Sequence, residues 1–342
     1  MTIQEAIAQL LRKQDLNAEQ MTDVMHALMT GNCTEAQIAG FLIALAAKGE
    51  SAEEIAAGAT VMRSLAAKVS PQSTELVDIV GTGGDASGTF NVSTACSFVV
   101  AGAGAKVAKH GSRSVSSKSG ASDLLQAAGV NIALSPTQVA HCIDEVGVGF
   151  MFAPNHHSAM KYVMPVRQQM AVRTVFNLLG PLTNPAFAKR QLIGVFDQRW
   201  VRPFAEVLKS MGSERAMVVH SADGMDEISI ADQTHYALLD QGTITEGVIQ
   251  PEDFGLPRAT LADIQVETPQ DSLSTVLAVL NGAEGPARDM VALNSGAAIF
   301  VAGLADDIAA GIFKAQRSID SAAARQALAG LIEKTQSMAA DA

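Results

Sequence analysis

The chain has 342 residues, more than the roughly 250–300 at which a single hydrophobic core stops growing, so two unequal domains are expected. Its composition is 48% hydrophobic, 17% charged and 4% aromatic, which is typical of a compact globular protein and excludes extended disorder. The net charge of -11 argues against nucleic-acid binding, because such binding depends on Lys and Arg side chains that neutralise phosphates.

The cysteines and the apolar runs indicate the compartment. Cys33, Cys96 and Cys142 have no CxxC spacing and cannot all pair, so neither a disulfide framework nor a cysteine metal site is indicated. Charged residues at positions 5, 12, 13 and 15 are incompatible with the apolar core of a signal peptide. Apolar runs stay far below the ~20 residues that span a bilayer. A cytoplasmic protein without membrane contact is expected.

Residues 1–72 are predicted to form a small helical domain. Capping-box patterns begin at Thr2, Asn17, Thr34 and Ser51, each with Glu or Gln three residues later. Apolar residues then recur at spacings of three and four, so each helix has one face to bury. An apolar face left over on these helices suggests a dimer contact.

Residues 73–342 are predicted to form a large α/β domain. Apolar runs at 75–80, 106–110, 147–153, 191–197 and 216–220 alternate with helical stretches, which indicates a mainly parallel, helix-covered central sheet. Runs at 227–231 and 236–239 are interpreted as an antiparallel ribbon at its edge. The region 158–185 is helical without a strand, and is expected to return to the helical domain.

The first chemical motif follows the first predicted strand and runs from Gly81 through Thr94. Closely spaced glycines followed by hydroxyl and amide side chains at a helix start let backbone N–H groups surround an anion. The motif is not a P-loop, because Thr89-Phe90 replaces Lys-[Ser/Thr]. It is not a dinucleotide fingerprint either, because Ala86 stands where the third glycine is required. A purely structural strand-to-helix turn is the alternative.

The second motif, residues 109–120, lies between a strand and a helix. Eight of its twelve side chains are hydroxyls or cations, which favours a second anion cradle over a plain polar loop. Two cradles on adjacent loops suit a ligand with two phosphate groups. In the third motif, Asp226 and Glu227 follow a glycine turn, and carboxylate oxygens suit Mg²⁺. Alone, such an acidic pair is usually solvated surface.

Together these segments, with Asn177-Leu-Leu-Gly-Pro-Leu-Thr-Asn-Pro185, resemble the anthranilate phosphoribosyltransferase family in the right order over nearly the whole chain. The resemblance implies transfer of the 5-phosphoribosyl group of PRPP to anthranilate in the second step of tryptophan biosynthesis from chorismate, giving N-(5-phosphoribosyl)anthranilate and pyrophosphate. It also implies one or two Mg²⁺ ions and a homodimer through the helical domain. Association with an anthranilate synthase subunit is not readable from the sequence.

The resemblance also assigns site residues. Those implied for PRPP are Gly81, Gly84, Asp85, Thr89, Asn91, Val92, Ser93, Thr94, Lys109, His110, Gly111, Ser112, Arg113, Ser114, Val115, Ser116 and Ser117. Those implied for anthranilate are Gly81, His110, Ser112, His157 and Arg167. The implied metal ligands are Ser93, Asp226 and Glu227. Without the resemblance, Arg167 is a surface helix residue and His156-His157 a helix start.

The expected chemistry requires no single acid or base, because the amine of anthranilate is already neutral at pH 7. Support for the transition state is assigned to Lys109, Arg113, Asp226 and Glu227. Ser112 and Ala121 depart from the family pattern, which commonly has Asn and Ser there, and this puts substrate affinity rather than reaction type in doubt.

Three alternatives remain open. A pyrimidine nucleoside phosphorylase has the same architecture but leaves the Asp226-Glu227 pair without a purpose. A non-catalytic nucleic-acid-binding relative is expected to be basic and to lack Arg167. The phosphoribosyltransferase class with paired acids after a strand is disfavoured, because the Asp306-Asp307 pair is expected in a helical segment.

Overall fold

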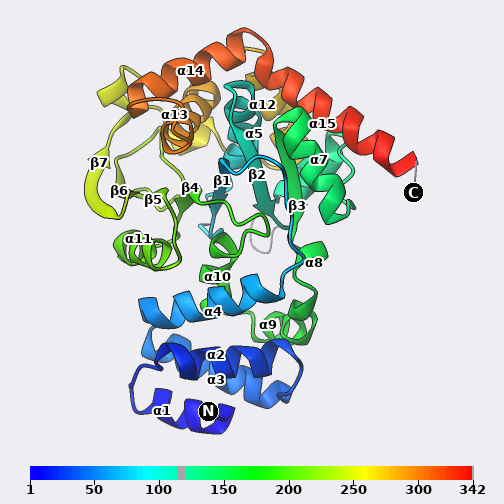
Figure 1. Ribbon diagram of the computed structural model, residues 1–342. Helices are drawn as coiled ribbons and strands as arrows, with labels where there is room; N and C mark the ends of the chain where they lie inside the picture. Colours follow the sequence, from blue (N-terminus) through cyan, green and yellow to red (C-terminus); the bar gives the residue numbers. More distant parts are fainter. Residues whose placement is uncertain (86, 114–119, 341–342) are drawn as a thin grey trace.

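A computed structural model describes residues 1–85, 87–113 and 120–340, without the side chains of residues 339 and 340. Two lobes are visible: a bundle of short helices at the N-terminus and a larger lobe built around a sheet (Figure 1). Over the described residues, no helix combines the length and the apolar character needed to cross a bilayer.

The N-terminal lobe is formed by helices α1 (Ile3–Leu11), α2 (Ala18–Met29), α3 (Glu35–Lys48) and α4 (Ala52–Leu65). Each begins with the predicted capping box. The side chain of the capping residue accepts the backbone N–H of the residue three positions later, and the side chain of that residue accepts the backbone N–H of the capping residue. The prediction of helix starts from the sequence is therefore confirmed.

An ionic cluster is buried where α3 meets α4. Glu54 is fully buried, and its carboxylate accepts the Leu16 N–H at 2.9 Å and the Ser51 N–H at 2.7 Å. The Lys48 ammonium lies 2.7 Å from the same carboxylate and also donates to Asp15. Because every oxygen of Glu54 has a partner, the charge is tolerated inside the bundle.

The large lobe contains a seven-stranded sheet in the order β3-β2-β1-β4-β5-β6-β7, in which β1 to β5 are parallel and β6 and β7 are antiparallel. This confirms the predicted fold class. Chain order runs outward in both directions from the β1–β4 pair, so the sheet has a topological switch point there. Its strands are β1 (Leu76–Gly81), β2 (Lys106–Gly111), β3 (Val148–Phe152), β4 (Arg190–Gly194), β5 (Arg215–Ser221), β6 (Thr234–Asp240) and β7 (Thr243–Ile249).

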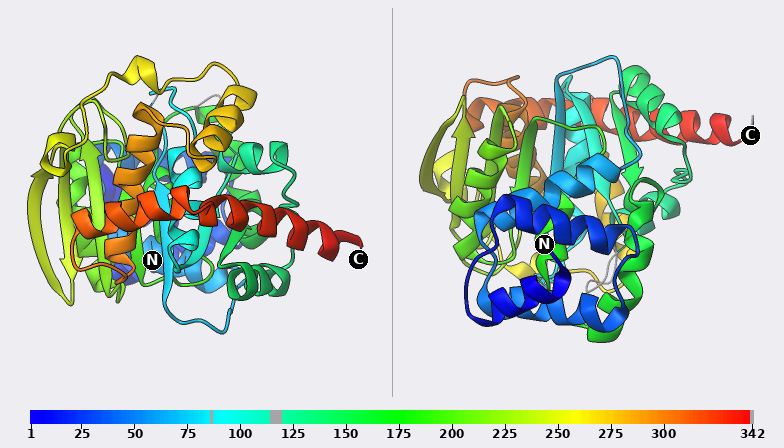
Figure 2. Two further views of the ribbon diagram at one scale, coloured as in Figure 1. Left: turned by 90° about the horizontal axis from the view of Figure 1, so that it is seen from above. Right: turned by 60° about the horizontal axis from the view of Figure 1, so that its bottom comes forward.

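Helices cover both faces of the sheet (Figures 1 and 2). Along β4, Leu192 packs into the core on one face and Ile193 into the core on the other, as the pleat of a strand requires. The core that contains Leu192 also includes buried residues of α5 (Val92–Gly102), α6 (Ala121–Ala127), α7 (Pro136–Val146), α12 (Pro269–Leu280), α13 (Pro286–Val301), α14 (Ile308–Asp320) and α15 (Ala323–Ala340). The core that contains Ile193 includes α11 (Val201–Ser210) and is continuous with that of the helical lobe.

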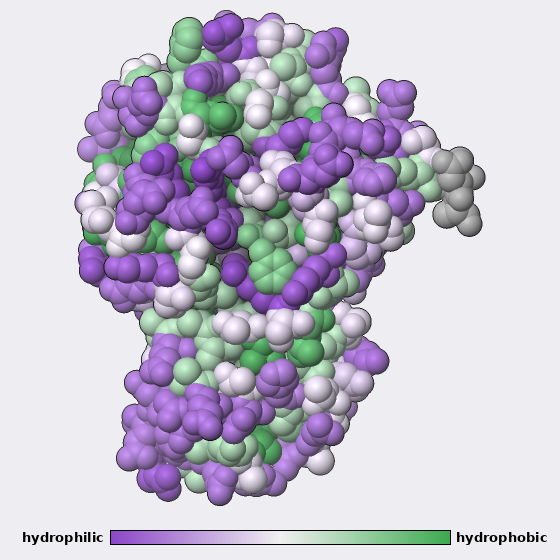
Figure 3. Space-filling view, in the orientation of Figure 1, coloured by the Kyte–Doolittle hydropathy of each residue, from purple (hydrophilic) through white to green (hydrophobic). Residues whose placement is uncertain are grey.

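The connection between β3 and β4 returns to the helical lobe, as predicted for residues 158–185. It consists of α8 (Ala153–His156), η1 (Ser158–Tyr162), α9 (Met164–Met170), α10 (Val175–Leu179) and η2 (Gly180–Leu182). α9 packs on α3, and α10 packs on α4. The lobes meet at a narrower waist where apolar residues gather on the surface (Figure 3). A domain division at residue 72 stays a prediction.

The predicted strand at 227–231 is wrong, and the antiparallel edge is formed by β6 and β7 instead. Ile228 and Ile230 are buried, which explains the strand-like pattern. The backbone of Ile228 and Ser229, however, is bonded by side chains: Asn294 accepts the Ile228 N–H at 2.9 Å and Thr234 accepts the Ser229 N–H at 3.0 Å. β7 escaped prediction because most of its residues face solvent.

The acidic pair Asp306-Asp307 is not inside a helix, contrary to expectation. It lies in the turn before α14, where Asp307 is the N-cap and its carboxylate accepts the Ala310 N–H at 2.7 Å. An acid at this position stabilises the helix start through the free N–H groups there. The pair still does not follow a strand.

Replacing Glu54 by Ala is expected to lower the free energy of unfolding by about 3–5 kcal/mol, because the buried Lys48 ammonium then keeps only the exposed Asp15 as a partner and the Leu16 N–H loses its acceptor. Urea unfolding measures this. The matched control is Glu53→Ala, which removes an exposed carboxylate that accepts the Ala18 N–H at 2.9 Å and is expected to change stability by less than about 1 kcal/mol. Equal effects of the two substitutions would contradict the role of the buried cluster.

Candidate active site

The glycine motif leaves the end of β1 beside β4, at the switch point of the sheet. Ligands of open α/β sheets bind outside the carboxyl ends of the strands at this place. Gly83 and Gly84 have φ of 68° and 81°, a region that favours glycine. The Gly83 N–H donates to the Asp226 carboxylate at 2.6 Å. The loop is therefore bonded directly to the acid of the third motif.

Gly81 is required by close packing rather than by its backbone conformation. A Cβ atom at this position would lie 2.3 Å from Oδ2 of Asp226. Gly194, its register partner on β4, is equally constrained, because a Cβ there would lie 1.5 Å from the Asp226 carbonyl oxygen. The two glycines at the strand ends make the space into which Asp226 fits.

The N-terminus of α5 follows the glycine loop and carries the predicted Asn91, Val92, Ser93 and Thr94. The Asn91 N–H donates to Ser272 Oγ at 3.0 Å, and the Ser272 hydroxyl donates back to Asn91 Oδ1 at 2.7 Å. The backbone of Ser93 donates to the Glu227 carboxylate. Oγ1 of Thr94 is buried without a hydrogen-bond partner among the described residues. Ser272, on α12, has no signal in the sequence.

Lys109 and His110 lie at the end of β2, next to β1, so the first two motifs lie on neighbouring loops as expected. The Lys109 side chain is buried and its ammonium donates to the Ile79 carbonyl at 2.6 Å. Burial lowers the pKa of Lys109, against the opposing effect of nearby Asp78, Glu227 and Asp226. The ammonium is thus the positive charge inside this group of acids.

In the second motif, Arg113 lies elsewhere than predicted, and another part of the motif lies outside the described residues. Arg113 is exposed and turns along α6, where it donates to Gln126 at 3.2 Å and lies 3.9 Å from Asp123. The structure does not bring it to the acids. The predicted Ser114, Val115, Ser116 and Ser117 lie outside the described residues. Ala121 begins α6, and the Ser112 carbonyl accepts the Ser122 N–H at 3.5 Å.

The acids Asp85, Asp226 and Glu227 gather near one another. Burial raises the pKa of Asp226 to about 7, and the nearby Asp85 carboxylate adds to the effect. Burial, then Asp226, also raises the pKa of Glu227 well above its ordinary value, while Lys109 opposes the shift. Buried carboxylates that repel one another are an arrangement that a cation relieves.

The donor set fits Mg²⁺. Carboxylate and hydroxyl oxygens are the hard ligands that this ion prefers, and it commonly keeps water and substrate phosphates in its shell. Within the described part of the chain, no three or more His, Cys, Asp or Glu side chains are placed to hold a metal by themselves. An ion bound at Ser93, Asp226 and Glu227 would complete its shell with water or with substrate oxygens.

The residues predicted for anthranilate come from both lobes. Nε2 of His110 lies 3.3 Å from Nε2 of His157, and the rings meet edge to face. Burial lowers the pKa of His157 to about 4 and that of His110 well below its ordinary value, so both rings are neutral at pH 7. Arg167, on α9, lies with its guanidinium 5.3 Å from the centroid of the Phe176 ring.

The Arg167 side chain combines partial burial with a positive charge. Its guanidinium is largely withdrawn from solvent, and burial lowers its pKa. No carboxylate among residues 1–85, 87–113 and 120–340 pairs with it within 4.0 Å. A half-buried cation without a fixed counter-ion favours a carboxylate ligand.

Three further residues support these segments and were not singled out from the sequence. The buried Asp78 accepts the His110 N–H at 3.2 Å and the Asn184 amide at 2.7 Å. Arg173 donates to the Gly84 carbonyl, and its guanidinium lies 4.4 Å from the centroid of the Phe196 ring. Asn184 belongs to the motif Asn177–Pro185, which is the one signal available. The other two are found only through the fold.

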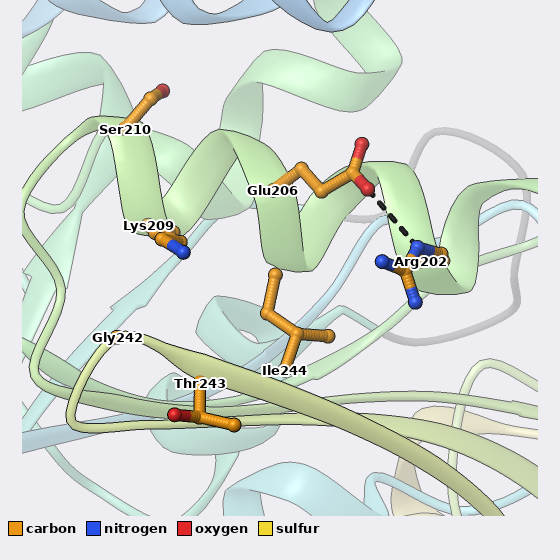
Figure 4. A pocket seen from close by; sticks show the side chains of 7 residues that line it. All are labelled: Arg202, Glu206, Lys209, Ser210, Gly242, Thr243 and Ile244. Atoms are coloured by element: carbon orange, nitrogen blue, oxygen red, sulfur yellow. Dashed lines mark hydrogen bonds and ion pairs between the residues drawn. The ribbon is translucent and has the colours of Figure 1, made fainter.

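A separate surface hollow lies away from these residues. It has a volume of about 620 Å³ between α11 and the β6–β7 hairpin and is lined by Arg202, Glu206, Lys209, Ser210, Gly242, Thr243 and Ile244 (Figure 4). Arg202 is already bonded to Glu206 at 3.0 Å and to Glu246 at 2.7 Å. The hollow has no group in common with the three motifs.

The two lobes correspond to two known domain families. Residues 4–66 match the glycosyl transferase family, helical bundle domain, and residues 73–325 match the glycosyl transferase family, a/b domain. The fold is thus that of a two-domain glycosyl transferase.

More specific relatives are the anthranilate phosphoribosyltransferases, to whose family this chain belongs. It is 56% identical over 337 residues to the one from Marinomonas sp. (98% of this chain, 97% of the relative) and 54% identical over 337 residues to the one from Thioalkalivibrio sulfidiphilus (98% and 100%). The crystal structure of the enzyme from Thermus thermophilus superposes with a TM-score of 0.91 at 39% identity, covering 97% of this chain and 99% of that one.

A Saccharomyces cerevisiae anthranilate phosphoribosyltransferase solved in complex with PRPP and Mg has a TM-score of 0.88 at 27% identity, and 98% of each chain is covered. The same yeast enzyme in complex with 4-fluoroanthranilate has a TM-score of 0.88 at 25% identity, again with 98% of each chain covered.

Substituting Gly81 by Ala is expected to lower kcat/KM for PRPP in the presence of Mg²⁺ about 100-fold, because the new Cβ displaces the Asp226 carboxylate. Steady-state kinetics at varied PRPP measure the effect. Gly40→Ala in α3 is the control, since its Cβ meets only Ile7 Cδ1 at 3.5 Å. Unchanged PRPP kinetics in a folded Gly81→Ala variant would contradict the packing argument.

His157 is expected to make stability depend on pH. Because its pKa in the folded protein lies near 4, below the ordinary 6.5, the unfolded chain binds more protons between these values. Stability from this residue is therefore present above about pH 6.5 and is lost as the pH falls toward 4. Across this window the wild type should lose up to about 1.4 kcal/mol per pH unit more than His157→Gln. Urea titrations at a series of pH values test this, and a constant difference would refute it.

Proposed function

We propose that this chain transfers the 5-phosphoribosyl group of PRPP to anthranilate with the help of Mg²⁺, releasing N-(5-phosphoribosyl)anthranilate and pyrophosphate, as in the second step of tryptophan biosynthesis from chorismate. The observation that carries the proposal is the meeting of the glycine loop, Lys109 and the acids Asp226 and Glu227 at one point of the sheet. The family relationship and the PRPP and Mg complex of the yeast enzyme support it.

PRPP is held by fixed N–H groups and by charge. The glycine loop at Gly83 and Gly84 and the positive end of the α5 dipole favour phosphate oxygens, while the Gly83 N–H itself holds the Asp226 carboxylate. Asn91, Ser93 and Thr94 stand at the same helix end. Lys109 adds a positive charge. Its attraction to a phosphate is screened less in the buried site than in water, because the dielectric constant there is lower.

Asp226, Glu227 and Ser93 are the residues proposed to hold Mg²⁺. When bound, the ion neutralises negative charge on the departing pyrophosphate. Lys109, already inside the acid group, adds to this support as the C1–O bond breaks. Of the residues first assigned to this task, Arg113 turns away along α6 and has to move in order to contribute.

Anthranilate is proposed to bind with its carboxylate toward Arg167 and its ring near His110, His157, Gly81 and Ser112. Neutral imidazoles do not protonate the amine, which must attack C1 with its lone pair free. Because Arg167 belongs to the segment packed on the helical lobe and PRPP lies on the large lobe, a small movement at the waist brings the amine in line with C1.

We further propose a homodimer through the helical lobe and a cytoplasmic location. Leu11 and Ile43 expose 71% and 46% of their surface on α1 and α3, which leaves an apolar face for a second copy. Cys33, Cys96 and Cys142 are free thiols, which agrees with a reducing compartment.

The direct test mixes protein, PRPP, Mg²⁺ and anthranilate and follows the loss of anthranilate fluorescence. Decay that requires both PRPP and Mg²⁺ is the expected result. No decay at any Mg²⁺ concentration rejects the proposal. A parallel assay with a pyrimidine nucleoside and inorganic phosphate distinguishes the nucleoside phosphorylase alternative.

Arg167→Ala is expected to raise KM for anthranilate about 10- to 100-fold, because a charge-assisted bond to the carboxylate is lost. KM for PRPP should change little, and Arg167→Lys should restore part of the affinity without the two-pronged contact. Arg199→Ala, at an exposed arginine far along the chain, is the control. An unchanged anthranilate KM in Arg167→Ala would remove this residue from the site.

A further inference from the structure

Asn294 lies in the middle of α13 and is fully buried, although its side chain is polar. Its Oδ1 accepts the Ile228 N–H at 2.9 Å, and its Nδ2 donates to the Ile228 carbonyl at 2.7 Å. The same Nδ2 also donates to the Met290 carbonyl one turn earlier in α13, at 2.9 Å. The amide therefore bonds both backbone groups of one residue, as a neighbouring strand would.

Ile228 directly follows the two acids of the site. Among the described residues no strand pairs with the segment 225–230, whose residues Met225, Ile228 and Ile230 are buried. A buried backbone without a sheet partner needs other hydrogen bonds to keep one conformation. At Ile228 these come from Asn294, and at Ser229 from Thr234.

Asp226 has little room to move. A Cβ at Gly81 or Gly194 would lie 2.3 Å or 1.5 Å from one of its oxygens, and the Gly83 N–H donates to its carboxylate at 2.6 Å. A shift of the following backbone at Ile228 would disturb this fit, unless that backbone is held from the other side. α13 lies on that side, packed against β4 and β5.

We propose that Asn294 is a positioning residue for metal binding: its amide holds Ile228 and thereby keeps the carboxylates of Asp226 and Glu227 aimed at the Mg²⁺ that accompanies PRPP. The inference rests on the proposed function. The proposal means that α13 influences the affinity for the ion although it contributes no ligand. Residues that orient ligands without touching the ion commonly change metal affinity.

The test measures Mn²⁺ binding directly, as a probe for Mg²⁺. The free Mn²⁺ signal in electron paramagnetic resonance is followed as protein is added, with and without PRPP, after subtraction of a protein-free Mn²⁺ and PRPP titration. Asn294→Ala and Asn294→Ser are expected to weaken Mn²⁺ binding in the presence of PRPP by about 10- to 100-fold. The control is Ser295→Ala, the next residue of α13, also fully buried, which should bind Mn²⁺ like the wild type.

The outcomes separate the two proposals. If the wild type binds no Mn²⁺ with PRPP, the proposed use of magnesium fails. If the wild type binds it and folded Asn294 variants bind it within about twofold as tightly, only the role of Asn294 is overturned. A purely structural residue would lower the melting temperature while leaving the Mn²⁺ affinity of the folded molecules unchanged.

A second measurement needs no variant and applies even if both substitutions prevent folding. In the wild type without metal, the backbone amide of Ile228 should exchange its hydrogen slowly, because Asn294 already holds it. Rapid exchange of the peptide covering residues 225–230 in the metal-free protein would overturn the inference.

Discussion

The candidate site depends on one packing constraint: the buried Asp226 carboxylate fits against Gly81 and Gly194 at the point where the strand order reverses, beside Glu227. Burial raises the pKa of both acids, and the nearby Lys109 ammonium opposes the shift at Glu227. In the proposed function, a bound Mg²⁺ supplies further positive charge at this point. The absence of side chains at Gly81 and Gly194 follows from the same constraint, since no other residue leaves Asp226 its place.

In the proposed function, the two lobes divide the binding of the two substrates. Backbone donors and acids belong to the large lobe, where the rigid sheet keeps them in register. Arg167 and Arg173 belong to the segment between α8 and α10, which packs on the helical lobe. Since Arg173 donates to the Gly84 carbonyl, this segment also touches the phosphate loop. Movement of one lobe against the other therefore acts on both substrate sites together.

Local patterns were enough for much of the fold. Capping boxes predicted the starts of α1 to α4, because each is a set of hydrogen bonds within four residues. Alternation of apolar runs with helices predicted the parallel sheet, and with it the neighbouring positions of the two loops. The segment 227–231 was mistaken for a strand, because Ile228 and Ile230 are buried with a spacing of two while the backbone of Ile228 bonds the side chain of Asn294. A burial pattern does not say which partner satisfies the backbone.

By itself the sequence determined which residue types are present for the chemistry: glycines that open a loop to an anion, Lys109 after a strand, and an acidic pair after a glycine turn. Only the tertiary structure decided which of them meet. It turned Arg113 along α6, placed Asp226 between two glycines, and brought Asn294 to Ile228, 66 residues away in the chain. The physical reason is that contacts between distant parts of a chain are set by packing of whole elements, which no local spacing records.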